Sequence, residues 1–332
     1  MNSDKSSQIV VGIGGNLLPK DIVELIKVGA NEFFVGYVPS TWSDIYGFAT
    51  SPNRRYWKVS SFTNFKDLQV AIDVIHQHQC KVSLAINELS YSSKAIKLTL
   101  DIAEEAIRAG IDAVIVADPD ILFNVHKMFP KIAIHASGEM GLYNKCAVKQ
   151  AASWGVNRIV LPRHLCISEI EILSGVSKQL TLETEAFVMS ERCCFEGAFC
   201  FPTHGYLEKN FCNDLVGLVP FQDSNEITDL CLLKKIKSHL EDYNDWRSHE
   251  ATSIEWLGGE CGLCAVKNLK AAGISYFKIV GRGIKKDTLV KRIQAVKATI
   301  RDAESNNNIA FCQNLIGDSQ TCQVGYRCYY RD

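Results

Sequence analysis

The sequence lacks several features that would tie the protein to a membrane or to an export route. No apolar run reaches the roughly 18 residues that a membrane-spanning helix requires. Residues 1–8 are polar and contain no apolar signal core. The net charge is −1, which argues against a surface dedicated to coating nucleic acid. We therefore expect a cytoplasmic globular protein with no membrane span.

Short apolar strands alternate with amphipathic helices along the 332 residues. The expected strands are residues 9–13, 32–36, 81–86, 113–116, 132–134, 158–161, 180–188 and 276–280. The expected helices are residues 19–28, 64–78, 94–109, 120–128, 145–154, 168–173 and 285–302. Alternation of this kind indicates an α/β fold with a parallel sheet, and eight units favour a closed (β/α)8 barrel of the TIM type. We expect the barrel at 1–303, with a cysteine-rich, cluster-binding segment at 190–264 inserted between strands seven and eight, and a cysteine-containing tail at 304–332.

Six of the thirteen cysteines form short groups in this inserted segment: Cys193, Cys194 and Cys200, then Cys212, then Cys261 and Cys264. Thiolates gathered in one segment are typical of soft-metal centres or iron-sulfur clusters. An odd number of cysteines and the absence of a signal core argue against a disulfide framework. A structural zinc usually shows two Cys-x2-Cys pairs, and here only the last group provides one. Zinc and disulfides remain the alternatives to a cluster.

The remaining cysteines have two simpler interpretations. Four of them lie in helical or strand patterns, where a free thiol packs as a small hydrophobe: Cys80, Cys146, Cys166 and Cys231. The other three lie in the tail: Cys312, Cys322 and Cys328. They either contribute to a second metal centre or belong to a loose terminal segment.

Polar side chains gather where the predicted strands end, which is where such barrels place their chemistry. Any one of these residues alone has an ordinary structural explanation, but together they favour a site: Asn87, His135, Ser137, Arg163, His164, Glu185 and Arg282. Arg282 lies between two glycines before a helix start, where backbone N–H groups and a forked guanidinium suit an anion. We predict catalytic roles for His135 and Glu185. We predict substrate binding by Asn87, Ser137, Arg163 and Arg282.

Several of these residues occur in segments that resemble the U-32 collagenase-like peptidase family. The segments run from His135-Ala136-Ser137 to Arg163 and Glu169, from Glu185-Ala186-Phe187-Val188 into Cys193-x6-Cys200, and from Leu263-Cys264-Ala265-Val266 to Lys278-Ile279-Val280-Gly281-Arg282. Despite its name, this family includes the paired proteins of anaerobic ubiquinone hydroxylation and proteins that hydroxylate uridine in tRNA or cytidine in ribosomal RNA. The resemblance implies a 4Fe-4S cluster, and prephenate as the oxygen donor in place of dioxygen.

The resemblance also implies a ligand set and shows two departures from the family pattern. The implied cluster ligands are Cys193, Cys200, Cys212 and Cys264, with Cys194 and Cys261 as substitutes because the gap between Cys200 and Cys212 is short. Where the family commonly reads His-Gly, this chain has Met189-Ser190, and where it reads Glu, this chain has Val280. Both departures remove candidate general bases, which leaves the substrate and the reaction step open.

Two function classes follow from these observations. One is an oxygen-independent hydroxylase, or a subunit of one, that uses prephenate on an RNA base or a small metabolite. The alternative is a peptidase or other hydrolase, for which Ser137 near His135 is the one nucleophile–base pairing visible in the sequence. A non-catalytic partner subunit is a third reading. The expected partners are a small-molecule anion, an RNA or metabolite acceptor, and a paired family subunit. The scattered basic pairs Arg54-Arg55, Lys234-Lys235 and Lys285-Lys286 do not decide between acceptors.

Overall fold

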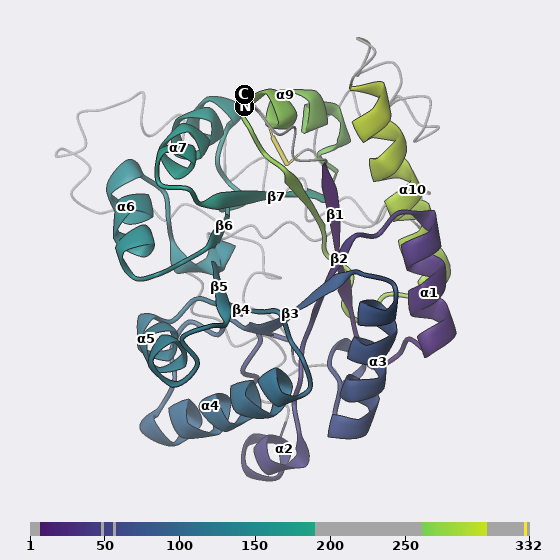
Figure 1. Cartoon of the computed structure of the whole chain (residues 1–332), viewed down its shortest axis with the longest axis vertical. Helices are drawn as coiled ribbons and strands as arrows, with labels where there is room; N and C mark the ends of the chain where they lie inside the picture. Colours follow the sequence, from purple (N-terminus) through teal and green to yellow (C-terminus); the bar gives the residue numbers. More distant parts are fainter. Residues whose placement is uncertain (1–6, 48–49, 56–57, 190–260, 304–328, 331–332) are drawn as a thin grey trace, which may run out of the picture.

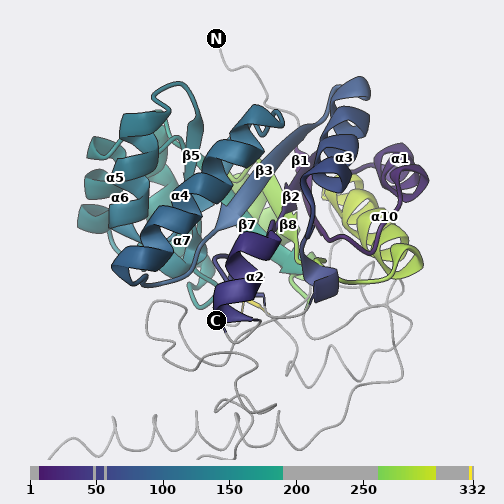
Figure 2. The same cartoon turned by 90° about the horizontal axis from the view of Figure 1, so that it is seen from below.

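Eight parallel strands close into a barrel surrounded by helices in the computed structural model, which describes residues 7–47, 50–55, 58–189, 261–303 and 329–330. The strands pair in chain order and β8 pairs with β1, with Val11 opposite Ile279. Figure 1 shows the strands at the centre and the helices around them, and Figure 2 shows the same arrangement from a perpendicular direction. The prediction of a (β/α)8 barrel is confirmed.

The bounds of the elements are close to those expected from the sequence. The strands are β1 (Gln8–Ile13), β2 (Glu32–Val35), β3 (Lys81–Ile86), β4 (Ala113–Val116), β5 (Ala133–Ala136), β6 (Arg158–Val160), β7 (Glu183–Met189) and β8 (Tyr276–Ile279). The α-helices are α1 (Pro19–Val28), α2 (Ser40–Tyr46), α3 (Phe65–Gln77), α4 (Ser93–Arg108), α5 (Pro119–Met128), α6 (Lys145–Ser153), α7 (Ile167–Gln179), α9 (Val266–Ala271) and α10 (Lys286–Asp302). Short 3-10 turns lie at η1 (Lys58–Ser60), η2 (Gly138–Met140) and η7 (Leu263–Ala265).

Side-chain caps fix where several of the helices begin. Asn64 accepts a hydrogen bond from the backbone N–H of Asp67 at the start of α3, and Asn144 does the same for Ala147 at the start of α6. Asp118 caps α5 through the N–H groups of residues 120 and 121. Each cap satisfies a backbone donor that has no partner inside the helix, which is why these short polar residues mark the loop-to-helix boundaries.

The main apolar core lies between the barrel and its helices, because strand side chains alternate between the two faces of the sheet. Phe33 and Val35 point outward and join the large cluster under the helices, whereas Phe34 points into the barrel with Val10 and Ile115. The interior also holds polar residues that are at most 5% exposed: Glu32, Ser83, His135, Arg158, Glu185 and Lys278. Barrels of this type usually fill that space with Val, Ile and Leu, so the charged interior is a specific feature of this chain.

The structure corrects three expectations. His135 was expected after strand five but lies within it, opposite Ile115 and Arg158 of the neighbouring strands, because β5 extends to Ala136. Helix α7 continues past residue 173 because Val176 and Ser177 are buried, and Gly175 faces open space. Cys146 is exposed rather than buried in the core, whereas Cys80 and Cys166 are half-buried.

Some of the predicted features lie outside the described residues. They include the cluster candidates Cys193, Cys194, Cys200 and Cys212, together with Cys231 and the tail cysteines Cys312, Cys322 and Cys328. The proposed domain boundaries at 190–264 and 304–332 therefore stay a prediction. Among the helices that the structure describes, none combines the length and apolarity needed to cross a bilayer.

Candidate functional site

A small pocket opens at the carboxyl ends of the strands, and we call it the mouth pocket. Its volume is about 50 Å³, which is several times the ~10–15 Å³ that one water molecule needs. That space admits a carboxylate group rather than a whole metabolite. Its lining residues are Phe34, Arg55, Ala85, Asn87, Ile115, Ser137, Glu139, Val160, Arg163, Phe187, Lys278, Val280 and Arg282. The four residues predicted to bind substrate, Asn87, Ser137, Arg163 and Arg282, are all among them.

Asn87 and Ser137 join the parts of the pocket wall that follow β3 and β5. Asn87 directly follows β3, and its Nδ2 donates to Ser137 Oγ over 3.2 Å. Ser137 directly follows β5, and its Oγ also accepts the backbone N–H of Glu139 over 3.2 Å, which caps η2. Among the described residues, Asn87 Oδ1 is buried without a hydrogen-bond donor. A bound molecule with an O–H or N–H group would supply the missing donor.

Arg163 follows β6 and lies between an acid and an aromatic ring. Its Nη1 donates to Glu139 Oε1 over 2.7 Å. Its guanidinium carbon lies 4.2 Å from the centre of the Phe187 ring, within the range of a cation–π contact. The ion pair and the ring together fix the direction of this guanidinium.

Arg282 is 7% exposed and only partly satisfied by the protein. Its Nη2 donates to the backbone oxygen of Asn53 over 2.9 Å, but in the described part of the chain Nε and Nη1 have no acceptor. A Cβ at Gly36 would come within 2.8 Å of Nη1, so this glycine makes room for the guanidinium. Burial, and then the charge of Arg55, lower the pKa of Arg282 well below its ordinary value. Two unpaired N–H groups on a buried cation indicate a place for an anion.

Lys278 is a member of this site that the sequence analysis did not single out. It is 5% exposed, and its Nζ lies 3.9 Å from the centre of the Phe34 ring and donates to Glu185 Oε1. Burial lowers the pKa of Lys278, and the adjacent Glu185 carboxylate opposes that shift. The signal in the sequence was a lysine inside the apolar strand Tyr276–Ile279 of a sheet expected to be buried on both faces.

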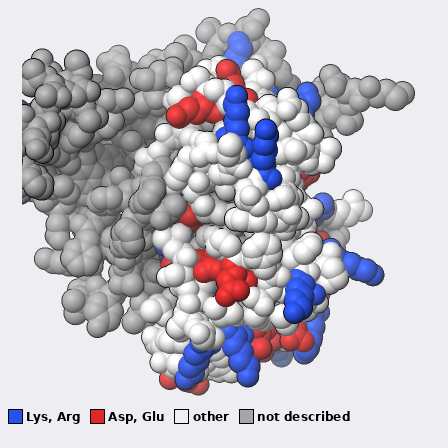
Figure 3. Space-filling view, turned by 90° about the vertical axis from the view of Figure 1, so that its left-hand side faces the viewer, with Lys and Arg blue, Asp and Glu red and all other residues white. Residues whose placement is uncertain are grey.

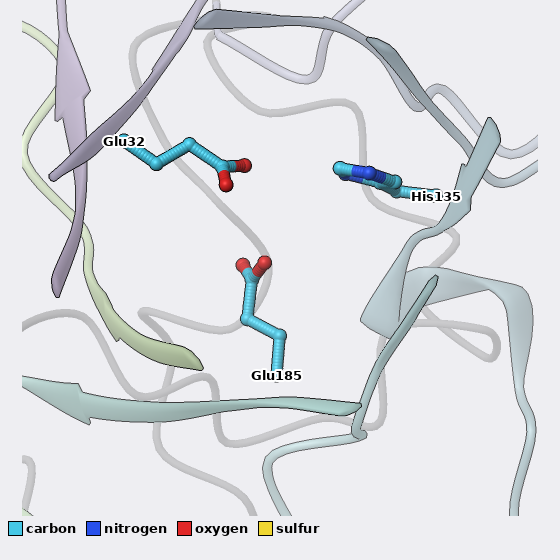
Figure 4. Close-up of side chains that lie close together, drawn as sticks. All are labelled: Glu32, His135 and Glu185. Carbon is cyan, nitrogen blue, oxygen red and sulfur yellow. The ribbon is translucent and has the colours of Figure 1, made fainter. Parts of the chain in front are cut away.

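His135 and Glu185, predicted as catalytic, lie deeper in the barrel than the mouth pocket and do not line it. Figure 4 shows their side chains pointing toward each other and toward Glu32. Arg158 joins the two acids: its Nη1 donates to Glu32 over 2.7 Å and to Glu185 over 3.0 Å. Arg158 and Lys278 overcome the effect of burial and lower the pKa of Glu185. The catalytic roles of His135 and Glu185 stay a prediction.

His135 is neutral in this environment. Burial is the main cause of its lowered pKa, and the charges of Arg158 and Lys278 add to it. Its Nδ1 is buried without a hydrogen-bond partner among the described residues.

The donor atoms of Glu32, His135 and Glu185 lie within 4.8 Å of one another, a spacing that suits a metal ion. However, Arg158 and Lys278 already pair with all four carboxylate oxygens. A divalent cation placed here would be repelled by Arg158 and Lys278. The carboxylates that could bind it are already paired with these two residues. The electrostatics thus favour a buried ion-pair network, which we call the inner network, over a metal site.

A larger cavity, about 540 Å³, lies at the opposite end of the barrel, where the strands begin. It reaches His135 and is lined by charges of both signs, including Lys81, Asp112, Arg158 and Glu183. Its size alone would favour it as the site. We favour the mouth pocket because barrels of this type carry their chemistry at the carboxyl ends of the strands and because Arg282 there has unsatisfied donors.

Cys264 lies at the same end of the barrel as the mouth pocket. It is half-buried in η7, and Cys261 just before it forms an antiparallel bridge with Met189 at the end of β7. The backbone N–H of Gly262 donates to Val188 O over 2.8 Å. These contacts hold both cysteines against the end of β7. The other three predicted cluster ligands lie outside the described residues.

The end of the tail also reaches this face. The Tyr329 ring stacks on Phe187 with centres 6.4 Å apart, and its backbone N–H donates to Cys261 O over 3.1 Å. The hydroxyl of Tyr330 donates to Phe187 O over 2.6 Å. Residues 329 and 330 therefore pack beside the mouth pocket and the cysteine turn.

The described basic pairs do not form a continuous positive surface. Arg54 pairs with Glu88 over 3.2 Å, and Lys286 pairs with Glu24 over 2.9 Å. On the face shown in Figure 3, basic and acidic side chains are interspersed. Lys234 and Lys235 lie outside the described residues. Charge on this part of the surface thus gives no preference for RNA.

Comparison with known proteins places the chain among relatives of one family. A family model described as peptidase family U32 matches residues 20–215, more than half of the chain. The tRNA hydroxylation protein P of Escherichia coli (strain K12) is 28% identical over 146 residues, 44% of this chain and 31% of that protein. The tRNA hydroxylation protein P2 of Bacillus subtilis (strain 168) is 24% identical over 268 residues, 79% of this chain and 76% of that protein.

These similarities have limits. The chain matches only about a third of the length of the Escherichia coli relative and of its Haemophilus influenzae counterpart, to which it is 31% identical. Among solved structures, the U32 peptidase Mk0906 is 11% identical, with a TM-score of 0.43 over 85% of this chain and 94% of that one. A likeness of that strength carries no inference about the site.

Proposed function

The chain belongs to peptidase family U32, and on that premise we propose that it is an oxygen-independent hydroxylase acting on a tRNA base, or a subunit of such an enzyme. The relatives from Escherichia coli and Bacillus subtilis are named tRNA hydroxylation proteins, which supports this acceptor over a quinone precursor or a peptide. The proposal places the protein in the cytoplasm, with tRNA. The main structural support for the proposed function is that Arg282 Nε and Nη1 have no hydrogen-bond partner among the described residues of the mouth pocket.

Prephenate is the oxygen donor that we propose for this pocket. It carries two carboxylates, and a guanidinium binds a carboxylate through parallel N–H donors. Arg163 and Arg282 both line the pocket, and the polar side chains of Asn87 and Ser137 lie beside them. The volume of about 50 Å³ fits one charged end of such a molecule, so the rest of it would extend outward.

We also propose a 4Fe-4S cluster held by Cys193, Cys200, Cys212 and Cys264, with Cys194 and Cys261 as substitutes. Thiolates are the ligands that such clusters use, and Cys261 and Cys264 are half-buried at the same end of the barrel as the pocket. When bound, the cluster would supply redox or Lewis-acid chemistry. The protein's own contribution is to hold the anion and to keep the site away from bulk water.

A peptidase is less well supported. A serine hydrolase needs a nucleophile hydrogen-bonded to a base. The described contacts of Ser137 Oγ are with Asn87 and the Glu139 N–H, while His135 Nδ1 has no partner within the described residues. The two residues belong to different levels of the barrel, one beside the mouth pocket and the other beside the opposite cavity.

The test is to measure hydroxylated nucleosides in total tRNA from a strain that lacks this protein. We expect one hydroxylated nucleoside to disappear and to return when the wild-type chain is supplied. A variant with Arg282→Ala should not restore it, whereas Lys285→Ala, outside the pocket, should. An unchanged nucleoside profile in the deletion strain would contradict the tRNA hydroxylase assignment.

A further inference from the structure

Tyr329 and Tyr330, near the end of the chain, are attached both to β7 and to the turn at residues 261–264, which we call the cysteine turn. The backbone N–H of Tyr329 donates to Cys261 O over 3.1 Å. The hydroxyl of Tyr330 donates to Phe187 O over 2.6 Å, although 143 residues separate the two in the chain. Both contacts join segments that are distant in the sequence, so no local pattern of the turn provides them.

These contacts meet an irregular stretch of β7. The strand shifts register against β8 between Phe187 and Met189, which leaves Val188 as an extra residue. Such a bulge interrupts the ladder of backbone hydrogen bonds, and backbone groups beside it take partners from elsewhere. The carbonyl of Phe187 accepts the Tyr330 hydroxyl. The carbonyl of Val188 accepts the backbone N–H of Gly262 over 2.8 Å. The tail and the cysteine turn thus bind neighbouring carbonyls of the same strand.

Gly262 makes room for the ring of Tyr330. A Cβ at this position would lie 3.0 Å from the ring, which is tighter than an ordinary contact, and 3.4 Å from the backbone of Val188. The φ of Gly262 is −120°, so the backbone conformation itself does not require a glycine. Because the Tyr330 hydroxyl is bound to Phe187 O, the ring cannot move away from an added methyl group without straining that hydrogen bond.

The ring of Tyr329 anchors the pair beside the mouth pocket. Tyr329 is 5% exposed and packs with Val160, Phe187 and Val280 in a small apolar cluster. Its ring centre lies 6.4 Å from that of Phe187, and the two ring planes are 23° apart. Burial of an aromatic ring removes a large apolar area from water, which favours the attached state of this segment.

We propose that Tyr329 and Tyr330 are positioning residues that hold the cysteine turn closed against β7, and that Gly262 is the seat of the Tyr330 ring. Without the two tyrosines, the turn would open more often, and its half-buried thiols, Cys261 and Cys264, would meet reagents in solution more often. This role of the chain's end goes beyond the proposed function and requires neither turnover nor tRNA.

The first experiment measures how fast each cysteine reacts with iodoacetamide in the full chain purified without oxygen, with peptide mass spectrometry as the readout. We expect Tyr330→Ala to raise the rates of Cys261 and Cys264 at least about tenfold, because the turn loses a hydrogen bond and the packing of a ring. Cys80, half-buried just before β3, should keep its wild-type rate. The matched control is Tyr46→Ala, which removes a half-buried tyrosine of α2 and should leave the two turn cysteines at their wild-type rates.

The second experiment tests the seat of the ring. Gly262→Ala should raise the same two rates in the wild-type background and have no further effect in Tyr330→Ala, because the added methyl group meets the ring. Tyr330→Phe keeps the ring and loses the hydroxyl, so it should raise the rates less than Tyr330→Ala does. Tyr329→Ala removes the ring that packs on Phe187 and should also raise them. Circular dichroism confirms that each variant is folded.

The outcomes are distinct. Unchanged rates of Cys261 and Cys264 in Tyr330→Ala would overturn the positioning role, and so would an equal rise at Cys80, because that pattern reports general unfolding. An effect of Gly262→Ala of the same size in both backgrounds would overturn its assignment as the seat. Rates in Tyr330→Phe as high as in Tyr330→Ala would overturn the contribution of the ring. A selective rise at the two turn cysteines in a protein that leaves tRNA unmodified would support this inference and contradict the proposed function.

Discussion

Arg158 and Glu32 face each other across the interior of the barrel, joined by hydrogen bonds of 2.7 and 3.0 Å although 126 residues separate them in the chain. The same guanidinium reaches Glu185 and Glu183 and lies 3.5 Å from the centre of the Tyr276 ring. One arginine thus ties β2, β7 and β8 to β6. Buried ion pairs contribute little net stability compared with apolar packing, so a network of this size indicates a requirement for fixed charge geometry.

Removing one partner from this network should be strongly destabilising. Arg158→Met leaves the Glu32 and Glu185 carboxylates buried without their shared cation, and we expect the free energy of unfolding to fall by about 3–5 kcal/mol. The matched control is Arg108→Met, which breaks an exposed ion pair with Glu104 on α4 and should cost no more than about 0.5 kcal/mol. Urea titration measures both. An equal decrease in the free energy of unfolding in the two variants would contradict this role of Arg158 in the inner network.

Acid should destabilise the protein partly through His135. Burial lowers its pKa below the ordinary 6.5, so as the pH falls below 6.5 the unfolded chain takes up a proton that the folded protein does not. The free energy of unfolding should therefore decrease by up to about 1.4 kcal/mol per pH unit until the pKa of the folded state is reached. His135→Gln should remove this part of the loss.

Urea titrations at about pH 7 and about pH 5.5 measure the effect, with His78→Gln on the exposed end of α3 as the control. The same acid sensitivity in His135→Gln as in wild type would contradict this assignment.

Loss of either pocket arginine should abolish prephenate binding without removing the cluster. Arg282→Ala removes two unpaired donors, and Arg163→Ala removes the cation held by Glu139. Arg282→Lys should recover little, because an ammonium lacks the fork and the reach of a guanidinium. Lys285→Ala should bind prephenate like wild type. Calorimetry gives the affinity and visible absorption reports the cluster, and retained binding in Arg282→Ala would place the donor elsewhere.

The cysteine prediction concerns metal content. Protein prepared without oxygen should contain about four irons and about four sulfides per chain. Cys264→Ala should lose its colour, as should Cys193→Ala and Cys200→Ala. Cys80→Ala should keep its colour. Cys80 lies just before β3, at the end of the barrel where the strands begin, and it is a half-buried thiol whose pKa is raised by burial. One equivalent of zinc with no iron would contradict the cluster assignment.

Hydrophobic periodicity in the sequence predicted the barrel and most element bounds. The α-helices it missed are α2 and α9, which are short and whose conformation depends on packing. The helix expected at residues 168–173 was too short, because Val176 and Ser177 are also buried and continue α7. In each case, tertiary packing decided the helix bounds, and the local sequence pattern did not show it.

The candidate site was predictable where residues follow strands and less so inside them. Asn87, Ser137, Arg163 and Arg282 come together because the ends of parallel strands meet at one rim. His135 and Glu185 were expected at that rim but belong to the inner network, since their depth depends on strand register. The partnership of Lys278 with Glu185 depends on two neighbouring strands that lie 93 residues apart in the chain, and no local pattern shows it.

The pairing of β1 with β8 also bears on how the protein folds while it is being made. Because Val11 lies opposite Ile279, the barrel cannot close until β8 has left the ribosome. Until then the inner face of the unfinished sheet is open to other chains. Glu32, Arg158 and Glu185 add charge to that face beside apolar side chains such as Phe34 and Ile115, so the apolar patch that other chains could contact is smaller. We expect the charges of the inner network to limit aggregation of the unfinished barrel as well as to stay fixed in the finished one.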